Sequence, residues 1–312
     1  MDKLNPERVV KFIELAAERQ RIYCYKTLGF ARPYTQDKQF DTWFFCNVFR
    51  DQDKVTKWIV ENVCKPYADM DNLWRKVILA RRLSRISSLE AVQKAGGFAD
   101  ISKAKPILKY LVAVGEPIIT NAFVMGIPDP SLGDNKVDYM FNLIEFYWQE
   151  GILPDALKTN SVEKVTRALM KAPNMGGFLS YEVATDFTYT RYLRNATDLK
   201  TWANPGPGCV RGLNVLCNGH EDIGIDKRNT LPIMRELLAR WQEYCTQDKV
   251  DQWVQSVKST QEKGKGFWLS GFPALFVRDS FSRFLSLSMR EVEHWLCEFD
   301  KHERTRDNKR RY

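Results

Sequence analysis

Apolar positions in this chain recur at the three- and four-residue spacing of helices over most of its length. The segment NPERVVKFIELAAERQRIYCY is a clear case, because charged residues separate its apolar ones. The apolar positions are Val9, Phe12, Ile13, Ala16 and Ala17. Asn5 followed by Pro6 is a typical helix start, since proline is well tolerated at the first helical position. The pattern predicts a first helix that begins near Pro6.

Further segments carry the same periodicity and predict further helices. They are DKVTKWIVENV, DMDNLWRKVILARRLSRI, KVDYMFNLIEFYWQEG, VEKVTRALMKA, NTLPIMRELLARWQEYC and SMREVEHWLCEFDKHER. Asn160 and Glu163 have the spacing of a capping box at the start of VEKVTRALMKA. Strand patterns are few, and only KGFWLSGFPALFV suggests a short hairpin. We predict a mostly α protein, residues 1–312 forming a single helical domain with two lobes.

Charge gives a first indication of the partner. The formal net charge is +8 and the isoelectric point about 9.0, which favours a polyanionic partner. A small anionic substrate would suit the same balance. The basic segment 304–312, RTRDNKRRY, reads as a disordered C-terminal tail.

Cysteine usage and the N-terminal sequence indicate the compartment. The seven cysteines are odd in number and form no Cys-x-x-Cys pair, so a disulfide framework is not expected and a reducing compartment fits. The N-terminus does not read as a signal peptide, and no apolar run is long enough to span a membrane. We expect a cytoplasmic protein, with no membrane partner.

Several kinds of catalytic motif are absent from the sequence. It contains no G-x-x-x-x-G-K-[ST] phosphate loop, no G-x-G-x-x-G after a strand and no H-E-x-x-H. Cys209, Cys217 and His220 lie near one another, but no fourth residue completes a familiar zinc spacing. The sequence therefore predicts no structural metal site, and it excludes a kinase of the phosphate-loop type.

The segment APNMGG, residues 172–177, joins two helical patterns through a very short link. Helix–hairpin–helix modules use a Gly-hydrophobic-Gly turn here, so that backbone N–H groups face a DNA phosphate at the start of the next helix. Asn174 stands where the first glycine is expected, and asparagine tolerates the left-handed conformation. Asn174, Gly176 and Gly177 are therefore candidate DNA contacts in a motif of about 161–190. A plain corner between two helices is the alternative.

Two N-terminal segments place guanidinium groups beside carboxylates. ERQRIY contributes Arg19 and Arg21, and NVFRDQDKVT contributes Asn47, Arg50 and Asp53. Such groups suit phosphate clamping with a positioned base. Taken alone, a solvated, salt-bridged surface explains them as well.

Two C-terminal segments hold the remaining candidates. ANPGPGCVRGLN offers glycine amides and Arg211 as an anion nest, with a structural loop as the alternative. In EHWLCEFDKHERTR, the i, i+4, i+7 spacing of His294, Glu298 and Lys301 puts them on one helix face. They are suited to acid–base and phosphate contacts, and ordinary charge pairing along a helix is the alternative.

Together, in this order, the segments ERQRIY, NVFRDQDKVTKWI, NMGGFLSYEVATDF with PGPGCVRGL, and EHWLCEFDKHERTR resemble the α-glutamyl/putrescinyl-thymine pyrophosphorylase family of bacteriophages. The resemblance extends from about Glu18 to Arg306. It implies a DNA-glycosylase-like helical fold with a helix–hairpin–helix motif, and a helical module shared with phage 5-hydroxymethyluracil DNA kinases. It also implies a role in thymine hypermodification inside an infected bacterial host.

The resemblance implies a transferase reaction on double-stranded DNA. A kinase first pyrophosphorylates 5-hydroxymethyluracil in DNA, and a family member then displaces the pyrophosphate with a free amino acid or polyamine. A functional link to a hydroxymethyluracil DNA kinase follows. The departing anion needs arginine, lysine or a metal, and the sequence leaves open whether Mg²⁺ takes part. The reaction also needs a base for the ammonium nucleophile, and the modified base must leave the duplex stack.

Residue chemistry suggests the roles. Arg19, Arg21, Arg50, Arg211 and Lys301 are the candidates for pyrophosphate, Asn47 for the base edge, and Asp53, Glu298 and His294 for proton transfer. Asp198 lies near the position of the catalytic aspartate in helix–hairpin–helix glycosylases, so it either orients the nucleophile or is structural. Two other functions stay open: a DNA glycosylase acting on a modified base, and a non-catalytic DNA-binding module.

Overall fold

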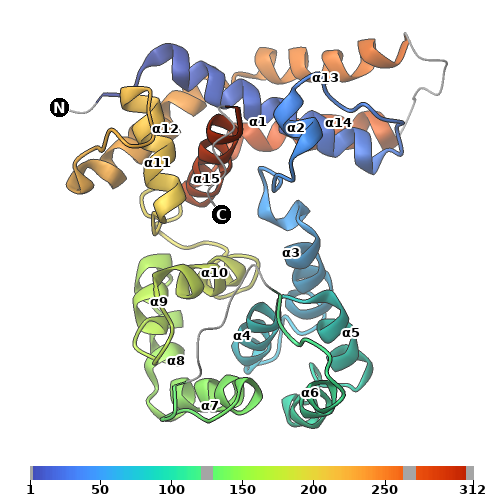
Figure 1. Ribbon diagram of the computed structural model, residues 1–312, viewed down its shortest axis with the longest axis vertical. Coiled ribbons are helices and arrows are strands. Elements are labelled where there is room, and N and C mark those ends of the chain that lie inside the picture. Colours follow the sequence, from blue (N-terminus) through green and yellow to red (C-terminus); the bar gives the residue numbers. More distant parts are fainter. Residues whose placement is uncertain (1–2, 121–128, 263–271, 307–312) are drawn as a thin grey trace. The chain divides into compact units, whose positions relative to one another are not determined.

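A computed structural model describes residues 3–120, 129–262 and 272–306. Every regular element in these ranges is a helix (Figure 1), so the prediction of a mostly α protein is confirmed. The second half of the expected hairpin segment is helical from Phe272. Its first half lies outside the described residues, as do residues 307–312 of the expected tail. Residues 304–306 of that tail continue the last helix.

The chain divides into two compact units, residues 1–50 with 200–312, and residues 51–199. The α-helices of the first unit are α1 (Pro6–Thr27), α2 (Lys38–Thr42), α11 (Pro207–Asn218), α12 (Thr230–Tyr244), α13 (Gln247–Glu262), α14 (Phe272–Ser282) and α15 (Met289–Arg306). Short 3-10 turns at Lys227–Asn229 and Arg283–Ser286 precede α12 and follow α14.

The second unit contains the helices between these two stretches. They are α3 (Lys54–Ile59), α4 (Leu73–Leu83), α5 (Ile86–Lys94), α6 (Ala104–Ala113), α7 (Lys136–Gln149), α8 (Ile152–Leu157), α9 (Val162–Leu169) and α10 (Gly177–Phe187). A π-helical turn, Val60–Cys64, continues α3, and a 3-10 turn, Ile101–Lys103, precedes α6. A further 3-10 turn, Arg50–Gln52, joins the two units in sequence.

Helix boundaries follow local chemistry. The side chain of Asn5 caps α1 by accepting the N–H of Arg8 at 3.0 Å, and Pro6 is its first residue, as predicted. The long run around LWRKVILARRLSRI is two helices, because Ser84 has a φ of 45° and ends α4. The capping-box prediction was wrong in register: Ser161 is the N-cap of α9, and Asn160 has a φ of 51°.

The core of the first unit is aromatic. Phe12 packs edge-on against Trp241 and Phe299, with ring centroids 5.4 and 5.2 Å apart. The indole N–H of Trp295 donates to the Phe12 carbonyl oxygen at 3.0 Å, so this buried ring keeps its hydrogen bond. These contacts join α1, α12 and α15.

Helix α11 lies directly against α15, and glycine makes this possible. A Cβ atom on Gly212 would stand 2.4 Å from the Leu296 carbonyl oxygen, and one on Gly208 would stand 3.2 Å from the Cys297 sulfur. Gly208 and Gly212 therefore serve close helix packing rather than an open loop, because the helix already begins at Pro207.

A buried ion pair crosses the core of the second unit. The guanidinium of Arg81 in α4 donates to both carboxylate oxygens of Asp186 in α10, at 2.5 and 2.6 Å. It also donates to the Thr56 hydroxyl at 2.9 Å. All three side chains are buried, and the two-pronged geometry ties α4 to α10.

Candidate active site

Four side chains named from sequence meet on one short segment of the first unit. The segment is residues 44–47, Phe44-Phe45-Cys46-Asn47, which follows α2. The four side chains come from α1 and α15: Arg19, His294, Glu298 and Lys301. Each binds a backbone group of a different residue of the segment. We call this arrangement the 44–47 cluster.

Two cations bind the first carbonyl groups of the 44–47 cluster. The ammonium of Lys301 donates to the Phe44 carbonyl oxygen and lies 4.9 Å from the ring centroid of Phe45. Arg19, only 6% exposed, donates to the Phe45 carbonyl oxygen at 3.1 Å. Arg19 therefore supports the segment from within the protein.

Glu298 and His294 bind the other end of the segment. The Cys46 N–H donates to the Glu298 carboxylate at 3.0 Å. His294 Nε2 lies 3.0 Å from the Asn47 carbonyl oxygen. Since a carbonyl oxygen only accepts, Nε2 carries the hydrogen, and a neutral imidazole then has its lone pair on Nδ1. The spacing that predicted one helix face is confirmed by this shared target.

Burial sets the protonation behaviour of Glu298. Removal from water raises the pKa of its carboxyl group, and the nearby Lys301 charge, the Cys46 N–H and Arg19 only partly oppose this. A carboxyl group with a raised pKa is suited to take and return a proton nearer neutral pH.

Other arginines of the first unit form ion pairs outside the 44–47 cluster. Arg21, partly exposed, pairs with Glu18 in the same helix at 2.7 Å. Arg211 pairs at 3.0 Å with the buried carboxylate of Asp300. Arg304 binds the same carboxylate. The charge of Arg211 is thus already paired with the Asp300 carboxylate.

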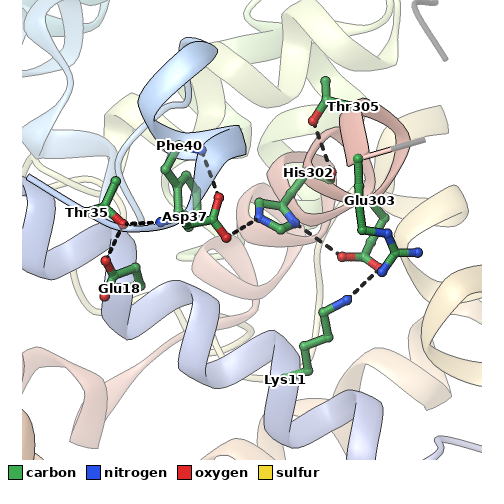
Figure 2. Close-up of polar contacts among 9 residues, drawn as sticks. Lys11, Glu18, Thr35, Asp37, Phe40, His302, Glu303 and Thr305 are labelled. Carbon is green, nitrogen blue, oxygen red and sulfur yellow. Dashed lines mark hydrogen bonds and ion pairs between the residues drawn. The ribbon is translucent and has the colours of Figure 1, made fainter. Parts of the chain in front are cut away.

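The next turn of α15 holds a second polar cluster, which was not predicted from the sequence (Figure 2). His302 Nε2 lies 3.0 Å from the Asp37 carboxylate and Nδ1 lies 3.2 Å from that of Glu303. Lys11 bonds Glu303 at 2.8 Å. The cluster connects α1, the N-cap of α2 and α15. The acidic spacing around His302 was a weak signal for it, because Asp37 is 265 residues away.

The turn between α9 and α10 lies in the second unit. Asn174 has a φ of 58°, the left-handed conformation expected there. Gly176 is the N-cap of α10, with φ −70° and ψ 170°, and a Cβ atom on it would meet nothing within 4 Å. Neither backbone strain nor crowding within the protein requires glycine at this exposed position.

Buried contacts attach the turn to the rest of the second unit. The Tyr139 hydroxyl donates to the Pro173 carbonyl oxygen at 2.7 Å, and Met175 is 2% exposed. Lys171, Asn174 and Phe178 are exposed. Pro173 and Met175 thus attach the turn to the protein, while Lys171, Asn174 and Phe178 face solvent.

Two other predicted carboxylates lie in the second unit. Asp198 accepts hydrogen bonds from the Ser161 hydroxyl at 2.7 Å and from the backbone N–H groups of Val162 and Glu163 at 2.8 and 3.0 Å. It caps α9, a structural role that accounts for the residue. Asp53 is the N-cap residue of α3, and its part in proton transfer stays a prediction.

One group of possible metal ligands in the described part of the first unit lies in the partly exposed turn after α11. His220, Glu221 and Asp222 hold ligand atoms within 4.8 Å of one another. Adjacent exposed acidic groups are common, so this grouping carries no metal assignment. Cys209 and Cys217 form no disulfide in the part of the chain that the structure describes, and the other five cysteines form none there either. Within the described ranges, no helix is both long and apolar enough to cross a membrane.

A protein-family profile matches almost the whole chain. The sequence profile described as 5-hmdU DNA kinase, helical domain, matches residues 7–311. The chain therefore belongs to the family of this helical domain.

The chain is similar in sequence to the 5-hmdU DNA kinase of Bacillus phage SP10. It is 28% identical over 234 residues, which cover 68% of this chain and 36% of the relative. The chain thus matches about a third of that protein's length. No solved structure matches.

Proposed function

We propose that this protein is a phage DNA-modifying transferase that displaces pyrophosphate from 5-pyrophosphoryloxymethyluracil in DNA with an amino acid or polyamine. The observation that carries the proposal is the 44–47 cluster in a chain whose family is the helical domain of a 5-hmdU DNA kinase. Residues 1–312 contain no G-x-x-x-x-G-K-[ST] phosphate loop, so the proposal does not assign the kinase step to these residues.

The proposed reaction balances in one displacement. The amine nitrogen forms a bond to the methylene carbon on the pyrimidine ring, and the bond from that carbon to oxygen breaks. Pyrophosphate leaves with the bonding electrons, and the excess proton of the amine passes to a base. The methylene carbon is allylic to the ring, so its bond to the leaving oxygen can loosen early.

The side chains support distinct roles. Glu298, with its raised pKa, takes the proton from the amine, with His294 as the second candidate. Arg21, Arg50 and Lys301 stabilise the departing anion, and Asn47 contacts the base edge. Arg19 acts as a positioning residue through the Phe45 carbonyl oxygen.

DNA binding is proposed for the turn between α9 and α10. Its left-handed Asn174, its exposed glycine at the N-cap and the N-terminus of an 11-residue helix together suit a phosphate contact. A side chain at Gly176 would occupy the space that a phosphate would take, which explains a glycine that the protein itself does not require.

Product analysis tests the proposal. The protein is incubated with DNA containing pyrophosphorylated hydroxymethyluracil and a mixture of amino acids and putrescine, and the DNA is digested to nucleosides for mass spectrometry. We expect a thymidine derivative carrying an added amine. Unchanged nucleosides with every amine would contradict it, and abasic sites would indicate a glycosylase.

A further inference from the structure

A hollow of about 630 Å³ lies within the second unit, apart from the residues assigned above. Helices α4, α7 and α8 and the segment after α10 line it, with Trp74, Trp148, Lys158, Arg191 and Asn195 among the lining residues. Its volume is in the range of pockets for small ligands. Aromatic rings, cations and a carboxamide converge in it.

Trp148 gives the hollow a stacking surface. Its side chain is 55% exposed although it is a large aromatic ring. The guanidinium of Arg75 lies 4.8 Å from its ring centroid and 5.3 Å from that of Trp74. Arg75 also donates to Glu145, one turn before Trp148 in α7, at 3.2 Å. These contacts hold the exposed indole in place, which reduces the cost of stacking a flat ligand on it.

Cations stand at the rim of the same hollow. Arg191 donates to the carbonyl oxygens of Asp69 and Met70 at 3.2 and 3.3 Å and pairs with the exposed Asp71 carboxylate at 3.0 Å. Lys158 pairs with the exposed Asp155 of the preceding turn, at 2.8 Å. Exposed pairs of this kind are weak, so an incoming phosphate can compete with both carboxylates.

We propose that this hollow binds one nucleotide unit, with the base stacked on Trp148 and the phosphate near Lys158 and Arg191. The exposed carboxamide of Asn195 offers a donor and an acceptor to the base edge. Base stacking with nearby cations is how proteins bind unpaired nucleotides. The inference does not depend on the transferase reaction, because binding alone tests it.

The test measures binding of the full-length protein to a fluorescent oligo-thymidylate by anisotropy at one fixed salt concentration. Trp148→Ala should weaken binding by at least about fivefold, since stacking contributes roughly 1–3 kcal/mol per base. Trp148→Phe, which keeps a ring, should retain most of the affinity. Tyr110→Ala, which removes another exposed ring of the same unit, is the control and should have no effect.

A second pair of variants tests the cation. Lys158→Glu should weaken binding more than Lys94→Glu, an equal charge change at an exposed site on α5. Competition with thymidine monophosphate then separates the sources: displacement indicates a free nucleotide, and Trp148-dependent binding without displacement indicates a strand. Equal affinity of wild type and Trp148→Ala, or equal losses in Trp148→Ala and Tyr110→Ala, would overturn the inference.

Discussion

The carboxylate of Glu298 accepts the backbone N–H of Cys46 at 3.0 Å, although 252 positions separate the two residues in sequence. This bond ties α15 to the segment that Arg19, His294 and Lys301 also hold. The carboxyl group proposed as the base therefore also positions the backbone of the 44–47 cluster. Substitutions of Glu298 that keep this hydrogen bond can separate its structural role from its proposed chemical role.

Replacing Glu298 by Gln should keep an oxygen acceptor for the Cys46 N–H and remove the proposed base. We expect turnover to fall by roughly 100-fold or more, the usual contribution of general base catalysis, with little loss of stability. Because the pKa of Glu298 is raised, the wild-type rate should fall with decreasing pH already above the ordinary range of a glutamate.

The pH–rate profile under saturating DNA checks this prediction. The residual activity of Glu298→Gln should lack the acidic limb, and Glu236→Gln, an exposed change on α12, should match wild type. An unchanged rate in Glu298→Gln would remove this residue from the mechanism.

Gly176→Ala should fold as stably as wild type and bind DNA less tightly. The φ of −70° suits alanine, and the added Cβ meets open space in the protein. We expect a loss of about 1 kcal/mol, the net value of one hydrogen bond, or roughly fivefold in affinity. Gly224→Ala, where the Cβ also meets nothing within 4 Å, is the control. The measurements are the affinity of each variant for duplex DNA and its thermal unfolding. Equal affinity of the two variants would indicate that the turn is a plain corner between two helices and does not contact DNA.

Asp186→Ala should strongly destabilise the second unit. It leaves the Arg81 guanidinium buried without its carboxylate, a loss of about 3–5 kcal/mol in comparable buried pairs. Asp155→Ala, which breaks the exposed pair with Lys158, should change the free energy of unfolding by less than about 1 kcal/mol. Urea titration of both variants measures the difference. Similar midpoints would show that the buried pair contributes little.

His302 should make stability depend on pH. Burial disfavours its charged ring, but hydrogen bonds to the Asp37 and Glu303 carboxylates outweigh this and raise the pKa of His302 (Figure 2). Burial likewise opposes the charged form of Glu303, and His302 and Lys11 outweigh it, lowering the pKa of Glu303 to about 2. Arg306 also pairs with Glu303, at 3.1 Å.

The free energy of unfolding should change with pH in a direction set by the shifted pKa values of His302 and Glu303. The histidine contribution is fully present below its unfolded pKa of about 6.5 and is lost as pH rises through the raised folded value. The Glu303 contribution is present above its unfolded pKa and is lost as pH falls toward 2. Urea unfolding from pH 5 to 9 should show a decline in wild type that is absent in His302→Gln. His220→Gln, at a more exposed ring, should keep the decline, and a pH-independent wild type would contradict the argument.

Local signals predicted local structure. The Asn5-Pro6 start, the left-handed Asn174 and the shared helix face of His294, Glu298 and Lys301 were all readable, because each depends on neighbours within about two turns of helix. The target of that face, residues 44–47, was not readable, since the contact spans some 250 positions. Gly212 appeared to belong to an open loop, because only the structure brings the Leu296 carbonyl oxygen against it. Asp186 carried no sign of its buried partner for the same reason.

The fate of the amine nitrogen tests the central proposal most directly. Activated DNA is incubated with the protein and each nitrogen-15-labelled amine in turn, and released pyrophosphate is measured beside the label in digested nucleosides. For the correct amine, we expect one labelled amine molecule in the nucleoside for each pyrophosphate released, and neither product without an amine. Pyrophosphate release with no label in the DNA, or release of the base to leave abasic sites, would contradict it.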